Sequence, residues 1–200
     1  MDARLKQLAE DASVAFGEAF ASTVTFCCHV QEDASTTFWS RYYIDLLNDS
    51  FFADDRPSIA RKLGNLAKTS SKARDEITSY NGILPLMRLL RYGDDEGKQW
   101  AAYALAYTTL DNENNAATLA EEGAIEPLVG LLSGTDGQKE FAARALWSLA
   151  KDNNANREAI TKAGAIKLLV DLLQDGTDSH VETTVRTSFM KEPFRLLWVY

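Results

Sequence analysis

The hydrophobic positions of this chain recur at helical rather than strand spacing. In LPLMRLL (84–90) and EPLVGLL (126–132), the apolar residues lie three or four positions apart, which predicts helices with one buried face. A longer alanine-rich segment follows each of them, GKQWAAYALAYTTL and then QKEFAARALWSLAK. Large aromatic residues in such segments, here Trp100 and Trp147, are expected to pack in the core or between helices. Polar runs such as DNENN separate the segments, so the pattern predicts an all-α protein.

The same order of helices recurs with a fixed period. Gly82, Gly123 and Gly164 follow one another at equal intervals, and the same interval separates Asn115 from Asn156. Glycine at these positions predicts that one helix ends and the next begins, because glycine tolerates the left-handed backbone of a helix C-terminus. Internal repetition at this spacing is typical of a helical solenoid.

The period divides the chain into three parts. Residues 1–35 are predicted to form one or more N-terminal capping helices, and residues 36–176 to form the repeats. The units run over 36–80, 81–121 and 122–162, and a further one starts at 163–176. Residues 177–200 are predicted to form a degenerate or truncated repeat or cap, because they lose the alanine-rich pattern and end in the apolar run FRLLWVY. Since a terminal repeat needs a polar outer face, Trp198 and Tyr200 suggest self-association or a missing neighbour at this end.

These units resemble the armadillo repeat. Its pattern opens on Gly-Ala-Ile, continues through paired leucines and an alanine-rich helix, and closes on Asn and Ile. The matching residues of the clearest unit are Gly123-Ala124-Ile125, Leu128-Val129, Leu131-Leu132, Ala142-Ala143, Ala145-Leu146, Leu149-Ala150, Asn156 and Ile160. The resemblance implies a right-handed superhelical solenoid of about three to four repeats. It also implies that the long third helices line a concave groove, which holds an extended peptide.

In peptide-binding armadillo proteins, a Trp and an Asn on each third helix form a ladder along the groove. The residues at these positions form the predicted concave stripe: Arg61, Asn65, Tyr103, Tyr107, Arg144 and Ser148. Residues four apart share one face of a helix, which supports a continuous stripe. Only Asn65 matches the ladder, and this departure argues against a receptor that reads basic localisation signals. Arg61 and Arg144 favour acidic residues or a C-terminal carboxylate instead.

Net charge and cysteine content restrict the classes of binding partner and the cellular location that we expect. The 200 residues carry a formal net charge of −8, which argues against nucleic acid and against electrostatic docking on anionic membranes. No apolar run approaches the length of a membrane span. The only cysteines are the neighbours Cys27 and Cys28, which offer no disulfide framework. We therefore expect a cytoplasmic protein, with the nucleus as the alternative.

Motifs that carry chemistry are missing from the sequence. It contains no phosphate-binding loop, no dinucleotide fingerprint, no HExxH and no GxSxG. Cys27, Cys28 and His29 are the only Cys/His cluster, and His180 is remote from them, whereas a zinc site needs four converging ligands. The sequence therefore predicts no enzyme, with no catalytic residue, no cofactor and no metal.

The leading hypothesis is a protein-interaction scaffold or adaptor, whose concave groove binds an extended segment of another protein. One alternative is a fragment like a nuclear-import receptor, which a pull-down with basic localisation peptides would detect. The other is a structural segment of a longer solenoid without its own ligand. Finding more repeats in the parent gene would favour this last alternative.

Overall fold

The described part of the chain is built from helices alone. The computed structural model describes residues 31–174, and side chains over 35–172. Within that range there are ten α-helices, one 3-10 helix and no strand, which confirms the all-α prediction. The elements in chain order are α2 (Gln31–Asn48), η1 (Ser50–Asp55), α3 (Arg56–Thr69), α4 (Ser71–Ser79), α5 (Ile83–Tyr92), α6 (Asp95–Thr108), α7 (Glu113–Glu121), α8 (Ile125–Leu131), α9 (Asp136–Ala150), α10 (Asn154–Lys162) and α11 (Ala165–Gln174).

Several predictions from the sequence fall outside the described residues. The proposed N-terminal cap over 1–35 lies almost wholly there, and so does the degenerate C-terminal segment over 177–200. The Cys27-Cys28-His29 cluster, His180 and the apolar end of the chain lie outside as well. Self-association through that end stays a prediction.

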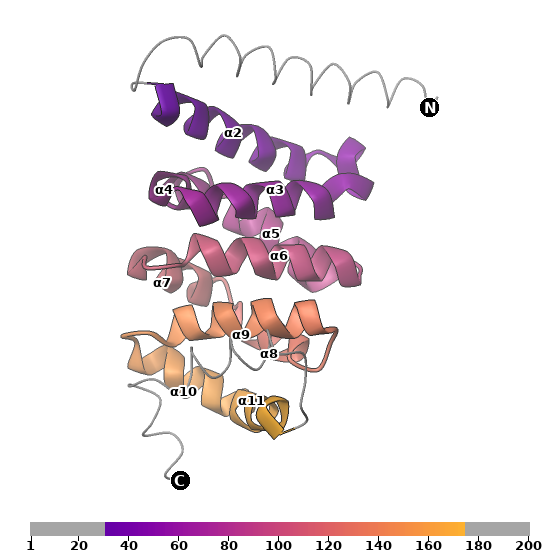
Figure 1. Cartoon of the computed structure of the whole chain (residues 1–200), viewed down its shortest axis with the longest axis vertical. Coiled ribbons are helices and arrows are strands. Elements are labelled where there is room, and N and C mark those ends of the chain that lie inside the picture. Colours follow the sequence, from indigo (N-terminus) through magenta and orange to yellow (C-terminus); the bar gives the residue numbers. More distant parts are fainter. Residues whose placement is uncertain (1–30, 175–200) are drawn as a thin grey trace.

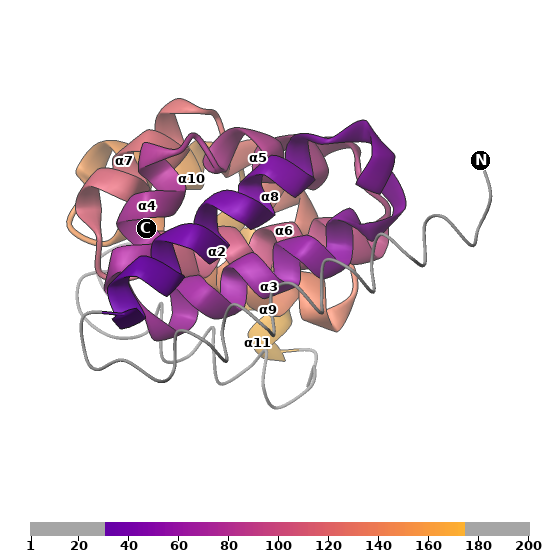
Figure 2. The same cartoon turned by 90° about the horizontal axis from the view of Figure 1, so that it is seen from above.

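The helices form a single stack, in which similar helices lie above one another (Figure 1). The long helix α3 packs on α6, and α6 packs on α9. Viewed down the stack, α3, α6 and α9 line one side, α5 and α8 lie behind them, and α4, α7 and α10 gather at one end (Figure 2). Each unit therefore contacts chiefly its neighbours along the chain, as expected for a solenoid.

The helix boundaries follow from side-chain caps and left-handed residues. Asn112 and Asn153 accept hydrogen bonds from backbone N–H groups three residues on and so cap α7 and α10. Gly123 and Gly164 have the predicted left-handed backbone, with φ of +71° and +82°. The prediction was wrong for Gly82, whose φ is −68°. Its neighbour Asn81 takes the left-handed position there, with φ of 57°.

Gly82 is explained by space rather than by backbone conformation. A Cβ atom at this position would lie 2.8 Å from the Cδ1 atom of Ile44 and 2.8 Å from the carbonyl oxygen of Ile77. Glycine therefore lets α5 start close against α2 and α4. The same residue type recurs with the period, but its physical role differs between units.

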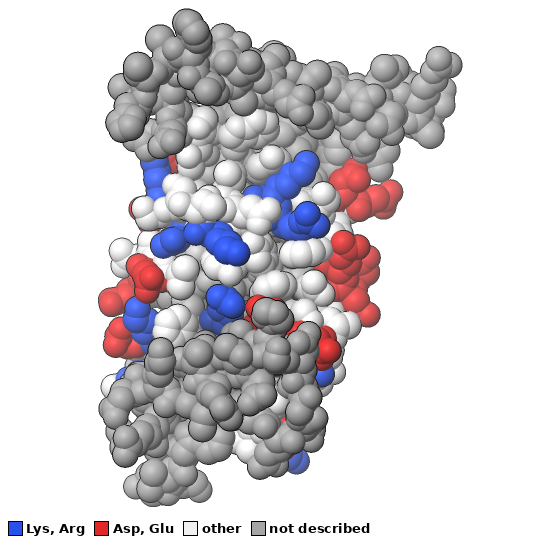
Figure 3. Space-filling view, in the orientation of Figure 1, with Lys and Arg blue, Asp and Glu red and all other residues white. Residues whose placement is uncertain are grey.

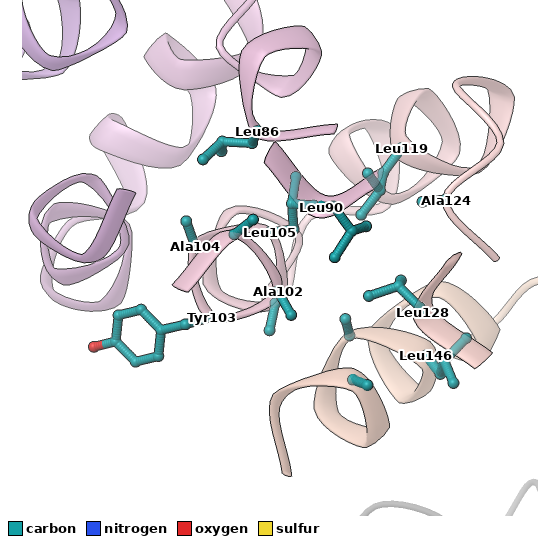
Figure 4. Packing of buried hydrophobic residues seen from close by; sticks show 14 of the residues in the cluster. Leu86, Leu90, Ala102, Tyr103, Ala104, Leu105, Leu119, Ala124, Leu128 and Leu146 are labelled. Atoms are coloured by element: carbon teal, nitrogen blue, oxygen red, sulfur yellow. The ribbon is translucent and has the colours of Figure 1, made fainter. Parts of the chain in front are cut away.

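Leucine and alanine side chains fill the space between the helices. Figure 4 shows leucines of α5, α7 and α8 facing the alanines and leucines of α6 and α9. Leu105 and Leu146, which occupy equivalent positions in α6 and α9, are fully buried. Burying a leucine side chain contributes about 1.5–3 kcal/mol, so this layer dominates stability. As predicted, Trp100 and Trp147 pack partly buried against the core.

Asn115 and Asn156 explain why an asparagine recurs in each unit. The Nδ2 atom of Asn115 donates to the carbonyl oxygens of Arg74 and Thr108, both at 3.0 Å. The Nδ2 atom of Asn156 donates to the carbonyl oxygen of Leu149 at 2.8 Å. Each asparagine therefore pairs with a carbonyl near the end of the long helix before it, where no intrahelical donor remains.

The glycine in the middle of α3 allows a test of helix packing. A Cβ atom at Gly64 would lie 2.4 Å from the Tyr103 ring and 3.0 Å from the Ala104 Cα atom. We expect Gly64→Ala to lower the free energy of unfolding by about 1–3 kcal/mol, because α3 and α6 must separate. Gly130→Ala is the control, since its Cβ would meet nothing within 4 Å. That variant should change stability by no more than about 1 kcal/mol, in the stabilising direction. Chemical denaturation measures both, and equal effects would contradict the close approach.

The buried asparagine gives a second test. Asn115→Ala should lower the free energy of unfolding by about 1–3 kcal/mol, because the buried carbonyl oxygen of Thr108 loses its donor and that of Arg74 loses one of its donors. Asn114 is the matched control, because it is exposed on the same helix. Asn114→Ala should stay within about 0.5 kcal/mol of the original protein. A small effect at both positions in urea denaturation would show that the Asn115 hydrogen bonds contribute little.

Candidate functional site

Most of the predicted stripe comes together on the side formed by α3, α6 and α9. The Tyr103 hydroxyl donates to the Oδ1 atom of Asn65 at 2.7 Å, which links α6 to α3. The Tyr103 and Tyr107 ring centres are 4.9 Å apart, in an edge-to-face arrangement. The guanidinium carbon of Arg144, on α9, lies 5.4 Å from the centre of the Tyr107 ring. The stripe therefore crosses all three long helices.

Three further residues join this surface, and the sequence reasoning had assigned them no role in binding. The guanidinium of Arg61 lies 5.2 Å from the centre of the Trp100 ring. Phe141 lies 4.9 Å from Tyr103 between ring centres, and the Lys68 Nζ atom is 5.4 Å from the Tyr107 centre. We refer to the set as the cation–aromatic face: Arg61, Asn65, Lys68, Trp100, Tyr103, Tyr107, Phe141 and Arg144.

Signals for the missed residues were present in the sequence. Trp100 and Phe141 are separated by the same interval as the repeating glycines and so occupy the same place in successive units. Trp100 also precedes Tyr103 by three positions, which puts both on one side of α6. Lys68 follows Asn65 by three positions on α3, so it shares that side by the same rule. A search of every residue on the stripe side, rather than of the ladder positions alone, would have found them.

The aromatic rings form the buried layer of the face, which we call its aromatic floor, and the cations lie over this layer on the solvent side. Tyr103 and Tyr107 are each only 7% exposed, whereas Arg61, Asn65 and Lys68 are exposed. The two tyrosines hold the helices together and present ring surface to the cations above. A ring beneath a cation attracts it through the negative charge of the ring face.

Ser148 does not belong to the exposed part of the stripe. It is 6% exposed, and its hydroxyl donates to the carbonyl oxygen of Thr109 at 2.8 Å. The hydroxyl therefore links α9 to the end of α6 and is already occupied. We leave Ser148 out of the proposed binding face.

Several N–H donors on this surface have no partner among the described residues and remain available to a ligand. Because the Oδ1 atom of Asn65 accepts from Tyr103, the amide N–H groups of Asn65 remain for a ligand. Arg144 has a carboxylate neighbour, since its Nη2 atom is 3.4 Å from the Oε1 atom of Glu140. Over residues 35–172, no ion pair involves Arg61 or Lys68. Two exposed cations of the face thus carry unpaired charge.

The positive charges act on the tyrosine below them. Burial raises the pKa of Tyr103 above its ordinary value, and the neighbouring Tyr107 raises it further. The guanidinium groups of Arg144 and Arg61 lower this pKa, because a positive charge stabilises the tyrosinate. Tyr103 therefore reports on whether the two arginines lie over the face.

Charge is unevenly distributed around this side of the molecule. In the orientation that shows α3, α6 and α9 in front, several Lys and Arg side chains gather over the middle, and most Asp and Glu side chains lie along the edges (Figure 3). Asp94, Asp95 and Glu96 are exposed at the start of α6. The protein is acidic as a whole, but this face is locally basic.

A separate hollow of about 720 Å³ lies where η1 and α3 meet the end of α5. Pro57, Pro85 and the exposed Tyr92 are among the residues that line it. Its charged lining is two arginines and two aspartates, Arg56, Arg88, Asp54 and Asp94. This balance favours no ligand of one charge, so the hollow is a weaker candidate than the cation–aromatic face.

The described residues offer neither a cluster of metal ligands nor a helix that could cross a membrane. In residues 31–174, no group of three or more His, Cys, Asp or Glu side chains is placed to hold a metal ion. Across the same residues, every helix is too short or too polar to span a lipid bilayer.

Comparison with known proteins gave matches among solved structures. No protein-family model matches the sequence, and the search of curated proteins found no match. A designed armadillo repeat protein superimposes with a TM-score of 0.67 at 26% identity, covering 74% of this chain and 62% of the design. Another, solved in complex with peptide (KR)4, has a TM-score of 0.65 at 26% identity, with the same two coverages. The armadillo repeats only protein from Plasmodium falciparum gives 0.59 at 23% identity, covering 67% of this chain and 59% of that one. The chain thus spans about three fifths of the length of these proteins.

The arrangement of Arg61 over the face can be tested through Tyr103. We expect Arg61→Gln to raise the pKa of Tyr103 further, because the variant loses a positive charge that stabilises the tyrosinate. NMR of the tyrosine ring carbons, followed from neutral to alkaline pH, resolves the individual tyrosines. Arg88→Gln, on α5, removes the same charge outside the face and should leave this pKa unchanged. An unchanged or lowered pKa in Arg61→Gln would contradict the placement of Arg61.

Proposed function

Since this chain has an armadillo-like repeat fold, we propose that it is a protein-interaction scaffold or adaptor, which holds an extended segment of another protein along the cation–aromatic face. The observation that carries this proposal is the row of unpaired donors on Arg61, Asn65 and Lys68, set over an aromatic floor that continues onto α9. The designed neighbour solved with peptide (KR)4 supports the view that such a stack can hold a peptide.

The chemistry of the face suits an extended peptide. A peptide in this conformation points successive side chains to opposite sides and leaves its backbone N–H and C=O groups free to bond. The amide N–H groups of Asn65 can donate to a backbone carbonyl oxygen of the ligand. The partly exposed Trp100 offers rigid apolar surface for its side chains. Binding of this kind needs no covalent step and no cofactor, so the proposed role is non-enzymatic.

The two alternatives are less well supported. A receptor for basic nuclear-import signals would use the Trp and Asn ladder, and here the cations at Arg61 and Arg144 occupy Trp positions. A structural segment of a longer solenoid would need no exposed, unpaired donors on its face. We propose the cytoplasm as the site of action and keep the nucleus as the alternative location.

The most direct test is to select peptides and map where they bind. A phage-displayed library of random twelve-residue peptides, selected on the full chain, should yield binders. Asn65→Ala should weaken them by about three- to tenfold, the effect of one hydrogen bond. Asn65 is preferred to Tyr103 or Tyr107, because both tyrosines are buried between helices and their replacement would disturb the fold.

Asn114→Ala provides the control, since Asn114 is an exposed asparagine on α7, outside the face. Its affinity for the selected peptides should equal that of the original protein. If the library yields no binder, or if both variants bind as the original does, the chain does not hold peptides on this face. The structural-segment alternative would then be preferred.

A further inference from the structure

We propose that the segment held on the cation–aromatic face is acidic, an extended peptide with Asp or Glu side chains at alternate positions. This inference rests on the proposed function and adds the chemical class of the partner. It follows from the charge of the face, from its hydrogen-bonding groups and from the charged residues around it.

Two of the three cations on the face have no ion pair in the part of the chain that the structure describes, although the Glu96 carboxylate accepts a hydrogen bond from the Trp100 indole N–H at 3.2 Å. Arg61 and Lys68 are exposed, and neither forms an ion pair within residues 35–172. Arg144 is partly neutralised, because Glu140 lies 3.4 Å from it. A ligand carboxylate would therefore complete pairs that the protein leaves open, and charge-assisted hydrogen bonds of this kind are the stronger ones. A ligand lysine or arginine would meet like charge.

The aromatic floor holds the cations in position. Trp100 lies under Arg61, and Tyr107 lies near both Lys68 and Arg144. Stacking uses the flat side of an arginine and leaves its N–H groups to bind a carboxylate in bidentate geometry. A long side chain that already rests on a ring also loses less conformational freedom when it binds. The face is thus arranged for anions before any ligand arrives.

The upper limit on the distance between Lys68 and Arg144 is compatible with a peptide that has alternate acidic residues. Lys68 Nζ and Arg144 Cζ each lie 5.4 Å from the centre of the Tyr107 ring, so their separation is at most twice that distance. Two side chains on one side of an extended peptide are about 7 Å apart, and this repeat falls within that limit. This upper limit leaves room for two carboxylates, two residues apart on the ligand, to reach both cations.

The surroundings of the face restrict where an acidic ligand can lie. Acidic side chains along the edges repel it, whereas the basic middle attracts it (Figure 3). The favourable path therefore runs along the stack, across α3, α6 and α9, rather than over its sides. The amide N–H groups of Asn65 carry no charge, but they add donors to the face and so favour an acceptor-rich ligand.

The experiment compares three twelve-residue peptides on the full chain, in which Ser alternates with Glu, with Gln or with Lys. Binding is followed by NMR through the indole N–H signal of Trp100, which lies on the face. We expect the Glu peptide to shift this signal and to bind at least about fivefold more tightly than the Gln peptide, with the Lys peptide weakest.

Two double variants separate local charge from net charge. Arg61→Gln with Lys68→Gln should weaken the Glu peptide by about fivefold. Arg88→Gln with Lys167→Gln removes the same charge from exposed positions on α5 and α11, and should leave the affinity nearly unchanged. Circular dichroism of each variant checks that its helices are intact.

Three results would overturn the inference: equal binding of the Glu and Gln peptides, tighter binding of the Lys peptide, or equal losses in the two double variants. If none of the three peptides shifts the Trp100 signal, the inference also fails. The random library then decides the proposed function separately, because neutral or apolar binders that depend on Asn65 would uphold peptide binding without acidic preference.

Discussion

The stacking of α3, α6 and α9 is the constraint on which the rest of the structure depends. It requires small residues at the points of closest approach, and Gly64 lies directly under the Tyr103 ring for this reason. That contact places the Tyr103 hydroxyl within 2.7 Å of Asn65 and brings the tyrosines between the helices. The cations of α3 and α9 then lie over the rings of α6. The packing of the long helices, the burial of the aromatic rings and the position of the cations over them thus follow from one arrangement.

Much of this could be predicted from the sequence, because repetition is a strong signal. The interval between Gly123 and Gly164 gave the length of the unit, and the alanine-rich helices gave its packing surface. That most of the ladder positions share a side could be expected in advance, since it needs only helical geometry. The structure also gives the recurring asparagines a reason that the pattern alone did not contain, a bond to the preceding long helix.

The features that could not be predicted depend on contacts between units, and the spacing of residues along the sequence does not determine these contacts. Gly82 matches Gly123 in the pattern, but the side chain of Ile44 determines its role. Ser148 occupies a ladder position, but a carbonyl group of the preceding unit binds its hydroxyl. The burial of Tyr103 and Tyr107 and the contact of Trp100 with Arg61 likewise depend on how closely one long helix packs against the next.

The asparagine bonds have a consequence for where the chain could be divided. The carbonyl oxygen of Thr108, at the end of α6, receives its donor from Asn115 in α7, and that of Leu149, in α9, receives it from Asn156 in α10. The end of a long helix is therefore completed only when the following helix is in place. Since α6 and α7 belong to one unit, and α9 and α10 to the next, each bond joins two helices of the same unit, and a chain cut between the two helices would leave the carbonyl without this donor.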